Sequence, residues 1–375
     1  MKNKIVALLF LAALTAGVTQ GQTAAVDTAD AALRRDIGEM LLIGFRGTTI
    51  DSGHHIVRDI QEYHVGSVIL FEYDSPSGTH HRNVASPQQL KELCTYLQGL
   101  TDEPLFISVD QEGGMVTRLK VRDGFPATRS PQSTATEGDK AVRSNARVVA
   151  QMLRSAGVNL NFAPCVDVNV NPACPVIGRL ERSFSADTDV VTRCARIWME
   201  EQTKRGVVSC LKHFPGHGSA KGDTHAGLVD VSSTWQETEL APYRTLIALG
   251  KVDMVMVAHV VNHRLGDTLP ASLSPAVVRG LLRRDMGFKG VVVTDDLAMG
   301  AIAKQYGLEE TLRLAILAGA DLLCLSNNGA QRYNPDIVPQ AVEAIVRMVH
   351  EGKLSRADIH ASAERVRTLK HKRLQ

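Results

Sequence analysis

At one point the sequence reads Lys212-His213-Phe214-Pro215-Gly216-His217-Gly218 and, four residues later, Asp223-Thr224-His225. An apolar run from Gly206 to Leu211 precedes this segment and is typical of a buried strand. The segment itself is too polar for a core, and we interpret it as a long loop that leaves the end of that strand. Loops held on a rigid scaffold often carry catalytic groups, so this loop is the first candidate for a functional site.

Asp223 and His225 form the most informative pair in the loop. In an extended segment, side chains two residues apart point the same way, so the two groups should meet. The carboxylate could then accept a hydrogen bond from one imidazole nitrogen, which fixes the tautomer and raises the basicity of the other nitrogen. The alternative is a solvated polar loop without chemistry, but the density of polar groups favours a catalytic loop.

Composition indicates a globular protein and excludes some functions. The 375 residues are 44% hydrophobic and 22% charged, and the net charge of +2, with no basic stripe, argues against a nucleic-acid partner. Aromatic residues make up only 5% of the chain, too few for long platforms that bind a polymer. No Cys-x-x-Cys pair occurs, which argues against a zinc knuckle or a thioredoxin-type motif.

The N-terminus is typical of a signal peptide over residues 1–21. Met1 to Lys4 is basic, and the apolar run from Ile5 to Ala16 is too short to span a membrane. We therefore expect a bacterial protein that is exported, periplasmic or secreted, and carries no lipid or membrane anchor, since no cysteine lies near the cleavage site. A buried N-terminal helix is the alternative.

Export would permit disulfides. However, most of the six cysteines lie in apolar runs, so we expect buried free thiols. Only Cys165 and Cys174 are close in sequence at two loop-like positions.

Eight short apolar runs alternate with helical segments over residues 30–375. The runs are Leu41 to Phe45, Val65 to Phe71, Leu105 to Val109, a strand within Val158 to Val168, Val207 to Leu211, Met254 to Ala258, Gly290 to Thr294 and Asp321 to Leu325. Continuous Val, Ile and Leu suit strands buried on both faces of a parallel sheet. The pattern predicts an α/β fold, a single-domain (β/α)₈ TIM-type barrel. A doubly wound open sheet is the alternative, but no G-x-G-x-x-G follows a strand.

The segments between the strands carry helix and loop signals. Ser86-Pro87 and Ser274-Pro275 predict helix starts, with serine as the cap and proline in the first turn. The stretch from Asp123 to Thr136 is rich in Gly, Pro, Ser and Thr and is predicted to be a loop.

Polar residues recur where the predicted strands end. They are Asp110-Gln111-Glu112-Gly113-Gly114 with Arg118, then Asp167 and Arg182, Lys212-His213, His259, and Thr294-Asp295-Asp296. Active sites of such barrels lie at the carboxyl ends of the strands. Any one group could be a structural ion pair, but the whole set on one rim favours an active site.

These motifs, in this order, resemble family 3 glycoside hydrolases and specifically their β-N-acetylglucosaminidase branch. The resemblance runs from Ile37 to Leu325 and includes Arg182-Ser183-Phe184 and Thr294-Asp295-Asp296-Leu297-Ala298-Met299. Thr224 departs from the serine that the family mostly has. Extra residues at 178–181 include a second arginine, Arg179, so the resemblance leaves open which arginine contacts sugar.

The resemblance implies an exo-acting, retaining enzyme that releases terminal β-linked N-acetylglucosamine. Asp295 would be the nucleophile of a covalent glycosyl-enzyme, and His225, oriented by Asp223, the acid and base. Hydroxyls and the N-acetyl group would be held by Asp110, Arg118, Arg182, Lys212 and His213. The glycines of the loop would let His225 swing toward a bound substrate. The expected partner is a small sugar or muropeptide, and we expect a monomer without cofactor or metal.

Three alternatives stay open at this point. His213, His217, His225 and Asp223 are acceptable zinc ligands, so a metal-dependent hydrolase is one. A wall-binding module without activity is the second, although Asp295 and His225 are both present. A β-glucosidase is the third, and that branch lacks the histidine-containing loop. The sequence does not decide between muropeptides, chitin oligomers and host glycans, or between water and phosphate as acceptor.

Overall fold

The computed structural model describes residues 28–329 and 332–374. The proposed signal peptide at residues 1–21 lies outside them and stays a prediction. Among the described residues, no helix is both long and apolar enough to cross a bilayer. All six cysteines are buried and free, as expected, and Cys165 does not pair with Cys174.

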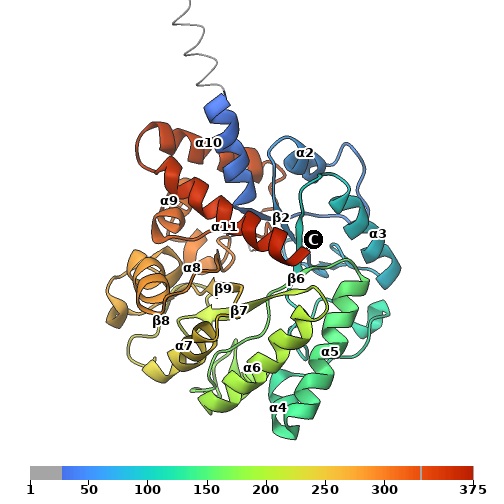
Figure 1. Ribbon diagram of the computed structural model, residues 1–375, viewed down its shortest axis with the longest axis vertical. Helices are drawn as coiled ribbons and strands as arrows, with labels where there is room; N and C mark the ends of the chain where they lie inside the picture. The colour runs from blue at the N-terminus through green and yellow to red at the C-terminus, as the bar shows by residue number, and fades with distance from the viewer. Residues whose placement is uncertain (1–27, 330–331, 375) are drawn as a thin grey trace, which may run out of the picture.

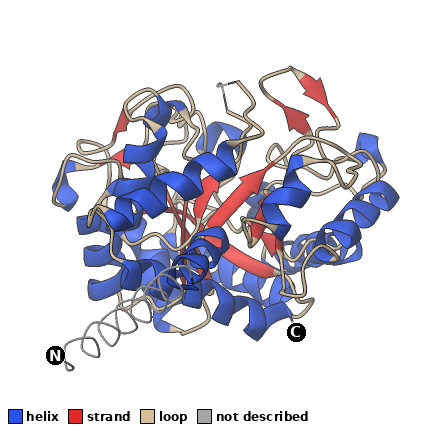
Figure 2. Cartoon of the chain, turned by 90° about the horizontal axis from the view of Figure 1, so that it is seen from above, coloured by secondary structure: helices blue, strands red, loops and turns tan. Residues whose placement is uncertain are grey.

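Eight parallel strands curl into a barrel at the centre of the molecule, with helices around it (Figures 1 and 2). In spatial order they are β11 (Val291–Thr294), β9 (Met254–Val257), β7 (Val208–Phe214), β6 (Leu160–Asn161), β5 (Phe106–Val109), β2 (Ser67–Ile69), β1 (Leu41–Gly44) and β12 (Leu323–Leu325). A parallel bridge between Val293 and Leu322 joins the two edges. The predicted (β/α)₈ barrel is therefore confirmed.

Helices connect the strands and form the outer layer of the barrel (Figure 1). A helix at residues 28–39 leads into β1. The others are α2 (His55–Gln61), α3 (Pro87–Gln98), α4 (Pro131–Glu137), α5 (Asp139–Ser155), α6 (Thr188–Thr203), α7 (Ala241–Ala248), the π-helix η6 (Ala276–Asp285), α8 (Gly300–Ala303), α9 (Leu308–Ala318), α10 (Ile337–His350) and α11 (Arg356–Leu374).

Short 3₁₀ helices and two small sheets decorate the loops. The 3₁₀ helices are η1 (Val121–Asp123), η2 (Gly178–Leu180), η3 (Glu237–Leu240), η4 (His263–Leu265) and η5 (Ala271–Leu273). The small sheets pair β3 (Tyr73–Asp74) with β4 (Thr79–His80), and β8 (Val229–Asp230) with β10 (Val260–Val261).

Ser-Pro pairs start helices in this fold. The Ser86 hydroxyl accepts the Gln89 N–H (3.2 Å), and Ser274 accepts the Val277 N–H (3.1 Å), so both predicted starts are confirmed. Ser130 caps α4 in the same way, by accepting the Ser133 N–H (3.2 Å). The predicted loop from residue 123 to 136 is therefore wrong in its second half, where the same cap begins a helix.

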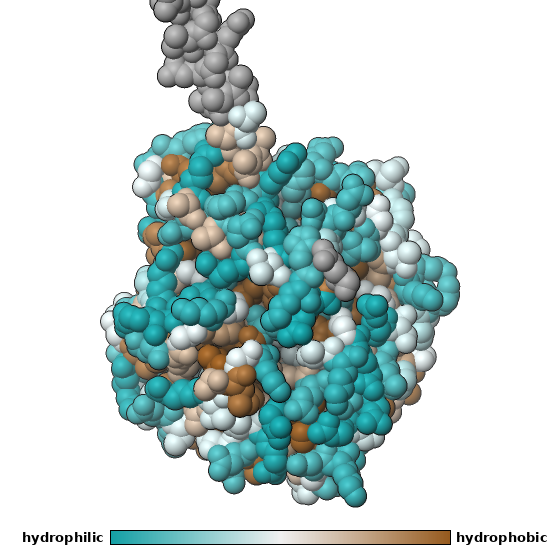
Figure 3. Space-filling model, in the orientation of Figure 1, coloured by the Kyte–Doolittle hydropathy of each residue, from teal (hydrophilic) through white to brown (hydrophobic). Residues whose placement is uncertain are grey.

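The C-terminal helix α11 closes one end of the barrel and crosses the strands in Figure 1. Val366 and Leu369 of α11 join the apolar cluster inside the barrel, with residues from the first positions of the strands such as Phe106. Arg373 pairs with Asp253, which lies just before β9 (2.9 Å). The face seen in this view is mostly hydrophilic (Figure 3). The carboxyl ends of the strands lie at the opposite end of the barrel.

Candidate active site

The predicted catalytic loop begins later than expected, because β7 continues through Phe214. Lys212 and His213 belong to the strand, and every residue from 212 to 220 is buried. The expectation of a loop from Lys212 onward, too polar for a core, is therefore wrong. Carboxylates that are distant in the sequence pair with these polar groups and allow them to be buried.

Charged side chains from the ends of β5 and β7 and from the loop after β6 form the floor of the site, which comprises Asp110, Glu112, Arg118, Arg182 and Lys212. The Lys212 ammonium lies 2.8 Å from Asp110 and 2.6 Å from Glu112. Arg118 pairs with the second oxygen of Asp110 (3.1 Å), while Arg182 donates to both oxygens of Glu112 (2.9 and 2.7 Å). Burial would raise the pKa of both carboxyls, but the adjacent cations outweigh it and lower both values. The floor is thus a compensated set of ionised groups.

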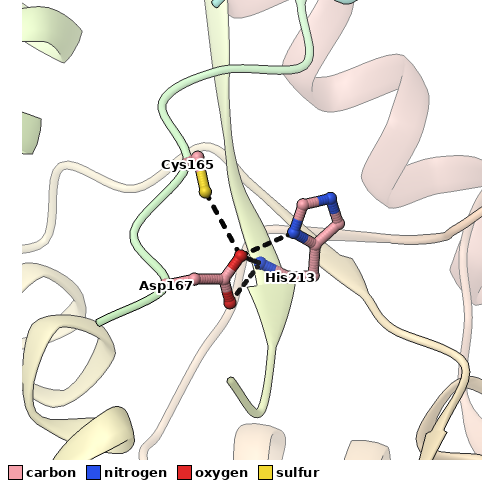
Figure 4. A group of neighbouring side chains, drawn as sticks. All are labelled: Cys165, Asp167 and His213. Atoms are coloured by element: carbon pink, nitrogen blue, oxygen red, sulfur yellow. Dashed lines mark hydrogen bonds and ion pairs between the residues drawn. The ribbon is translucent and has the colours of Figure 1, made fainter. Parts of the chain in front are cut away.

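His213 lies beside the floor in a fixed tautomer. An Arg182 N–H points at His213 Nε2 (3.1 Å), and because a guanidinium can only donate, Nε2 must accept. Nδ1 therefore carries the proton and donates to Asp167 (2.7 Å, Figure 4). Asp167 also accepts the Cys165 thiol (3.2 Å) and the His217 backbone N–H (2.7 Å). This hydrogen bonding fixes the ring that borders the site.

Cys165, Asp167 and His213 are also the one group within residues 28–329 and 332–374 whose possible metal-ligand atoms converge, all within 4.8 Å. Their hydrogen bonds to one another already occupy the facing atoms (Figure 4). The four residues considered as zinc ligands do not form such a group, since the His225 side chain is 67% exposed and that of His213 only 8%. The arrangement favours a hydrogen-bonded support over a metal centre.

Asp295 stands at the carboxyl end of β11 among imidazoles. Its Oδ1 accepts the backbone N–H of Asp296 (2.8 Å). Burial would raise the pKa of its carboxyl, but His259, His213 and His225 outweigh burial and lower it. Asp295 is therefore held as a carboxylate, the form that a nucleophile requires.

Asp296, its neighbour, has the opposite environment. One oxygen accepts the Ser326 hydroxyl (2.5 Å), and the other accepts the backbone N–H groups of Ser326 and Ala298 (both 3.1 Å). Burial raises the pKa of Asp296 despite these bonds. The Asp296 carbonyl in turn fixes His259, whose Nε2–H donates to it (2.9 Å). Asp296 thus holds the turn that presents Asp295.

The predicted contact between Asp223 and His225 is confirmed. The Asp223 carboxylate accepts both the His225 Nδ1–H (2.7 Å) and the His225 backbone N–H (2.8 Å). The geometric reason we expected is wrong, because the segment is a turn closed by the bond from Ala226 N–H to the Asp223 carbonyl (3.0 Å) and not an extended strand. The contact leaves His225 Nε2 free.

The loop that carries His225 docks on the segment that follows Asp295. Backbone N–H groups of Gly300 and Ala301, in α8, donate to the carbonyls of His225 (3.2 Å) and Thr224 (3.0 Å). The Lys304 ammonium donates to the Ala226 carbonyl (2.7 Å). One short stretch of chain therefore supports both Asp295 and His225.

These groups surround a cavity of about 620 Å³ at the carboxyl end of the barrel, a size typical of ligand clefts. Four predicted site residues line it: Asp110, Arg118, His225 and Asp295. Lys212 and Arg182 of the floor, and His213 beside it, are almost completely covered, and Asp223 lies behind His225. Arg182 is the arginine that joins the floor, whereas Arg179 is exposed.

The sequence profile of the glycosyl hydrolase family 3 N-terminal domain matches residues 32–369. The chain belongs to glycosyl hydrolase family 3.

Relatives in this family carry consistent names. A β-hexosaminidase of Neisseria meningitidis is 37% identical over 292 residues, which cover 74% of each chain. One from Xylella fastidiosa is 34% identical and is covered over 87% of its length by 82% of this chain. A family 3 β-N-acetylglucosaminidase from Paenibacillus has 36% identity and a TM-score of 0.81, with 91% of this chain covering 62% of that longer protein. The prediction of a family 3 glycoside hydrolase of the β-hexosaminidase type is thereby confirmed.

Two residues of the site, Glu112 and Asp167, were noted at the ends of predicted strands but were given no role from the sequence. Both stand in segments that were noted, one in the Asp-Gln-Glu-Gly-Gly motif and one at the end of the fourth strand. Their partners, Arg182 and His213, are 70 and 46 residues away. A single sequence gives no signal for such pairs.

Proposed function

We propose that the protein is an exo-acting, retaining β-N-acetylglucosaminidase with Asp295 as nucleophile and His225 as acid and base. The observation that carries the proposal is that the ionised Asp295 and the Asp223-supported His225 line one cavity. A cavity closed below by the charged floor suits a chain end, which supports exo action.

In the first step Asp295 attacks the anomeric carbon, and the bond to the glycosidic oxygen breaks as His225 protonates that oxygen. The product is a glycosyl ester on Asp295 and a free leaving group. In the second step water attacks the anomeric carbon from the face opposite Asp295. His225 takes a proton from this water, and the bond to Asp295 breaks. Two displacements retain the anomeric configuration.

The hydrogen bond to Asp223 decides which nitrogen of His225 acts. A carboxylate only accepts, so Nδ1 carries a proton throughout and Nε2 is the atom that gives and takes one. Nε2 is an acid only when the ring is doubly protonated, and Asp223 stabilises that cation. One imidazole can therefore give a proton in the first step and take one in the second.

The remaining predicted residues would hold the sugar from below. Asp110 and Arg118 line the cavity. Asp110 would accept hydrogen bonds from sugar hydroxyls, and Arg118 would donate hydrogen bonds to them. Lys212, Arg182 and His213 would orient Asp110 and Glu112. They would contact the hydroxyls and the N-acetyl group at the deepest part of the cavity.

Rates on a panel of aryl β-glycosides test the proposal. N-acetylglucosaminide should be hydrolysed faster than the glucoside, N-acetylgalactosaminide and xyloside, with the β-anomer as first product by NMR. Asp295→Ala should lose at least ~10³-fold in kcat while circular dichroism shows an intact fold. An α-anomer as first product, or a preference for glucoside, would refute the proposal.

We also propose export, from the basic and apolar character of residues 1–21. Mature protein from the native host should begin near Gln22, and native protein that still starts at Met1 would count against export. The proposed enzyme needs no metal and acts as a monomer. Activity should survive a strong chelator, and one species of monomer mass should sediment.

A further inference from the structure

The cavity has a covered floor and an exposed mouth. The Lys212 side chain at the floor is 2% exposed, and that of Asp110 is 16% exposed. Tyr73 and Met115 line the same cavity, but they are 41% and 73% exposed. They are two of only six large hydrophobic residues that are exposed among the described residues. Apolar surface gathered at a ligand cavity suggests a binding role.

The position of His225 tells which part of a substrate reaches the mouth. An acid must contact the glycosidic oxygen, and the His225 side chain is itself largely exposed at this cavity. The sugar that is cleaved off would lie on the floor side of His225. The leaving group must then extend on the mouth side, toward the exposed residues.

Tyr73 is held rigidly in the small hairpin of β3 and β4. It pairs with His80 across the hairpin, and the two rings lie 5.1 Å apart. The Tyr73 carbonyl accepts the side-chain amide of Asn328 (3.0 Å), whose oxygen accepts the Ser75 N–H (2.9 Å). The hairpin is therefore tied to the loop after β12.

A buried ion cluster anchors the same hairpin from below. The Asp74 carboxylate accepts two bonds from Arg46 (2.7 and 3.0 Å) and one from the buried Arg82 (2.6 Å). Burial would raise the pKa of Asp74, but these arginines and Ser77 outweigh it and lower that pKa. Because the hairpin that carries Tyr73 is already held in place, ligand binding would cost little conformational entropy there.

Met115 is presented by a tight turn after β5. Gly113 and Gly114 both have positive φ (94° and 61°), and the Gly113 N–H donates to the Val116 carbonyl (3.1 Å). Only glycine adopts two such conformations easily, so the turn projects the Met115 side chain outward. A flexible thioether adapts well to irregular ligand surfaces.

We infer that Tyr73 and Met115 form a subsite for the sugar unit on the leaving-group side of the cleaved bond. The inference rests on the proposed function and extends it to the substrate class. The ring of Tyr73 would stack on the apolar face of a pyranose, as aromatic rings commonly cover flat apolar surfaces while a polar edge stays in water. The preferred substrate is then an oligosaccharide and not a glycoside of a small alcohol.

The test compares Tyr73→Ala with Tyr96→Ala, a control on the outer helix α3 with a similar exposure of 39%. The substrates are the β-linked N-acetylglucosamine disaccharide and β-N-acetylglucosaminyl fluoride, whose leaving group is one atom and cannot reach the subsite. For Tyr73→Ala we expect kcat/KM on the disaccharide to fall about 3- to 10-fold, mostly through KM, with no change on the fluoride. Tyr96→Ala should match wild type on both, and Met115→Ala should show a weaker form of the Tyr73→Ala result.

A second measurement needs no turnover. In the Asp295→Ala background, calorimetric affinity for the disaccharide should fall with Tyr73→Ala, while affinity for free N-acetylglucosamine should not. Equal losses on disaccharide and fluoride, or unchanged KM and affinity for the disaccharide, would overturn the subsite. A wild-type enzyme that cleaves neither substrate would instead overturn the proposed function, so the two failures are distinct.

Discussion

The surroundings of two adjacent carboxyls, Asp295 and Asp296, shift their pKa values in opposite directions. Imidazoles lower the pKa of Asp295, while burial raises that of Asp296. Environments that separate two neighbouring groups often mark the division of roles in an active site. In the proposed mechanism Asp295 is the reactive group, whereas Asp296 holds the turn through its bonds with Ser326 and Ala298.

His225→Ala should reduce the rate of hydrolysis by an amount that depends on the leaving group of the substrate. A sugar cannot depart as an anion, so the disaccharide should lose the ~10²- to 10⁴-fold that general acid help provides. Glycosylation by dinitrophenyl N-acetylglucosaminide should lose far less, and added azide should speed turnover by replacing the base-assisted water. Asp223→Ala should give a milder form of this result. Equal losses on both substrates without azide rescue would mean that His225 only binds or shapes the loop.

At the scale of elements, the loop that carries His225 depends on α8. The Gly300 N–H donates to the His225 carbonyl, and a Cβ at position 300 would lie only 2.5 Å from that oxygen. The proposed nucleophile and the proposed acid are thus aligned by one turn and one short helix. The loop glycines were expected to allow His225 to swing, and this docking is the contact that such a motion would break.

Gly300→Ala should therefore displace His225 and act like a mild loss of the acid. Misplacing a catalytic group by about 1 Å can cost ~10²-fold, so we expect a 10- to 100-fold loss on the disaccharide and a smaller one on the dinitrophenyl substrate. Gly307→Ala is the control, because a Cβ there meets nothing within 4 Å. If both glycine variants behave alike, or if Gly300→Ala raises KM equally for both substrates, docking does not position His225.

At the scale of the whole molecule, the cavity and the apolar contacts of helix α11 lie at opposite ends of the barrel. Helix α11 closes the end where the strands begin, and the cavity opens where they finish. Between the two ends, next to the loop that carries His225, lies a buried carboxyl whose ionised form destabilises the folded state. Glu239 of η3 is completely buried; its Oε1 accepts the Gln236 N–H (3.1 Å), and its Oε2 faces the segment that follows β7. A Cβ at Gly216 would lie 2.8 Å from that oxygen, so the loop packs directly on it.

Glu239 should make the stability of the protein fall as pH rises. Burial raises the pKa of Glu239 from 4.5 to about 7. The folded state binds this proton more tightly, so its contribution is complete below pH 4.5 and is lost as pH rises through 7. The total is about 3 kcal/mol, from about 1.4 kcal/mol for each pKa unit.

Urea denaturation at pH 5 and pH 8 measures this effect. Glu239→Gln should reduce the loss of unfolding free energy between the two pH values relative to wild type. Glu237→Gln, at an exposed position of the same 3₁₀ helix, should leave the loss unchanged. If Glu239→Gln retains the full pH dependence of wild type, burial of Glu239 does not control it.

Most of the barrel could be predicted because its strands are continuous apolar runs, and all eight lie within the predicted segments except for the end of β7. That exception has a physical reason, since Lys212 is buried only because Asp110 and Glu112, in the segment that follows β5, neutralise it. The helix α4 was missed although Ser130-Pro131 is a cap signal, because its composition resembles a loop. The residues Asp295 and His225 came from motifs, whereas the floor and the docking of the loop depend on contacts between distant segments.

The central claim, that Asp295 carries the glycosyl group and His225 frees it, is tested most directly in the His225→Ala variant. With a dinitrophenyl N-acetylglucosaminide the first step should proceed, and without the base the covalent intermediate should accumulate. Mass spectrometry of a rapid acid-quenched digest should find one N-acetylglucosaminyl residue on the peptide that contains Asp295, with fragmentation assigning it to that carboxyl. An adduct on Asp296 or any other side chain, or burst release of dinitrophenol without an adduct, would contradict the account.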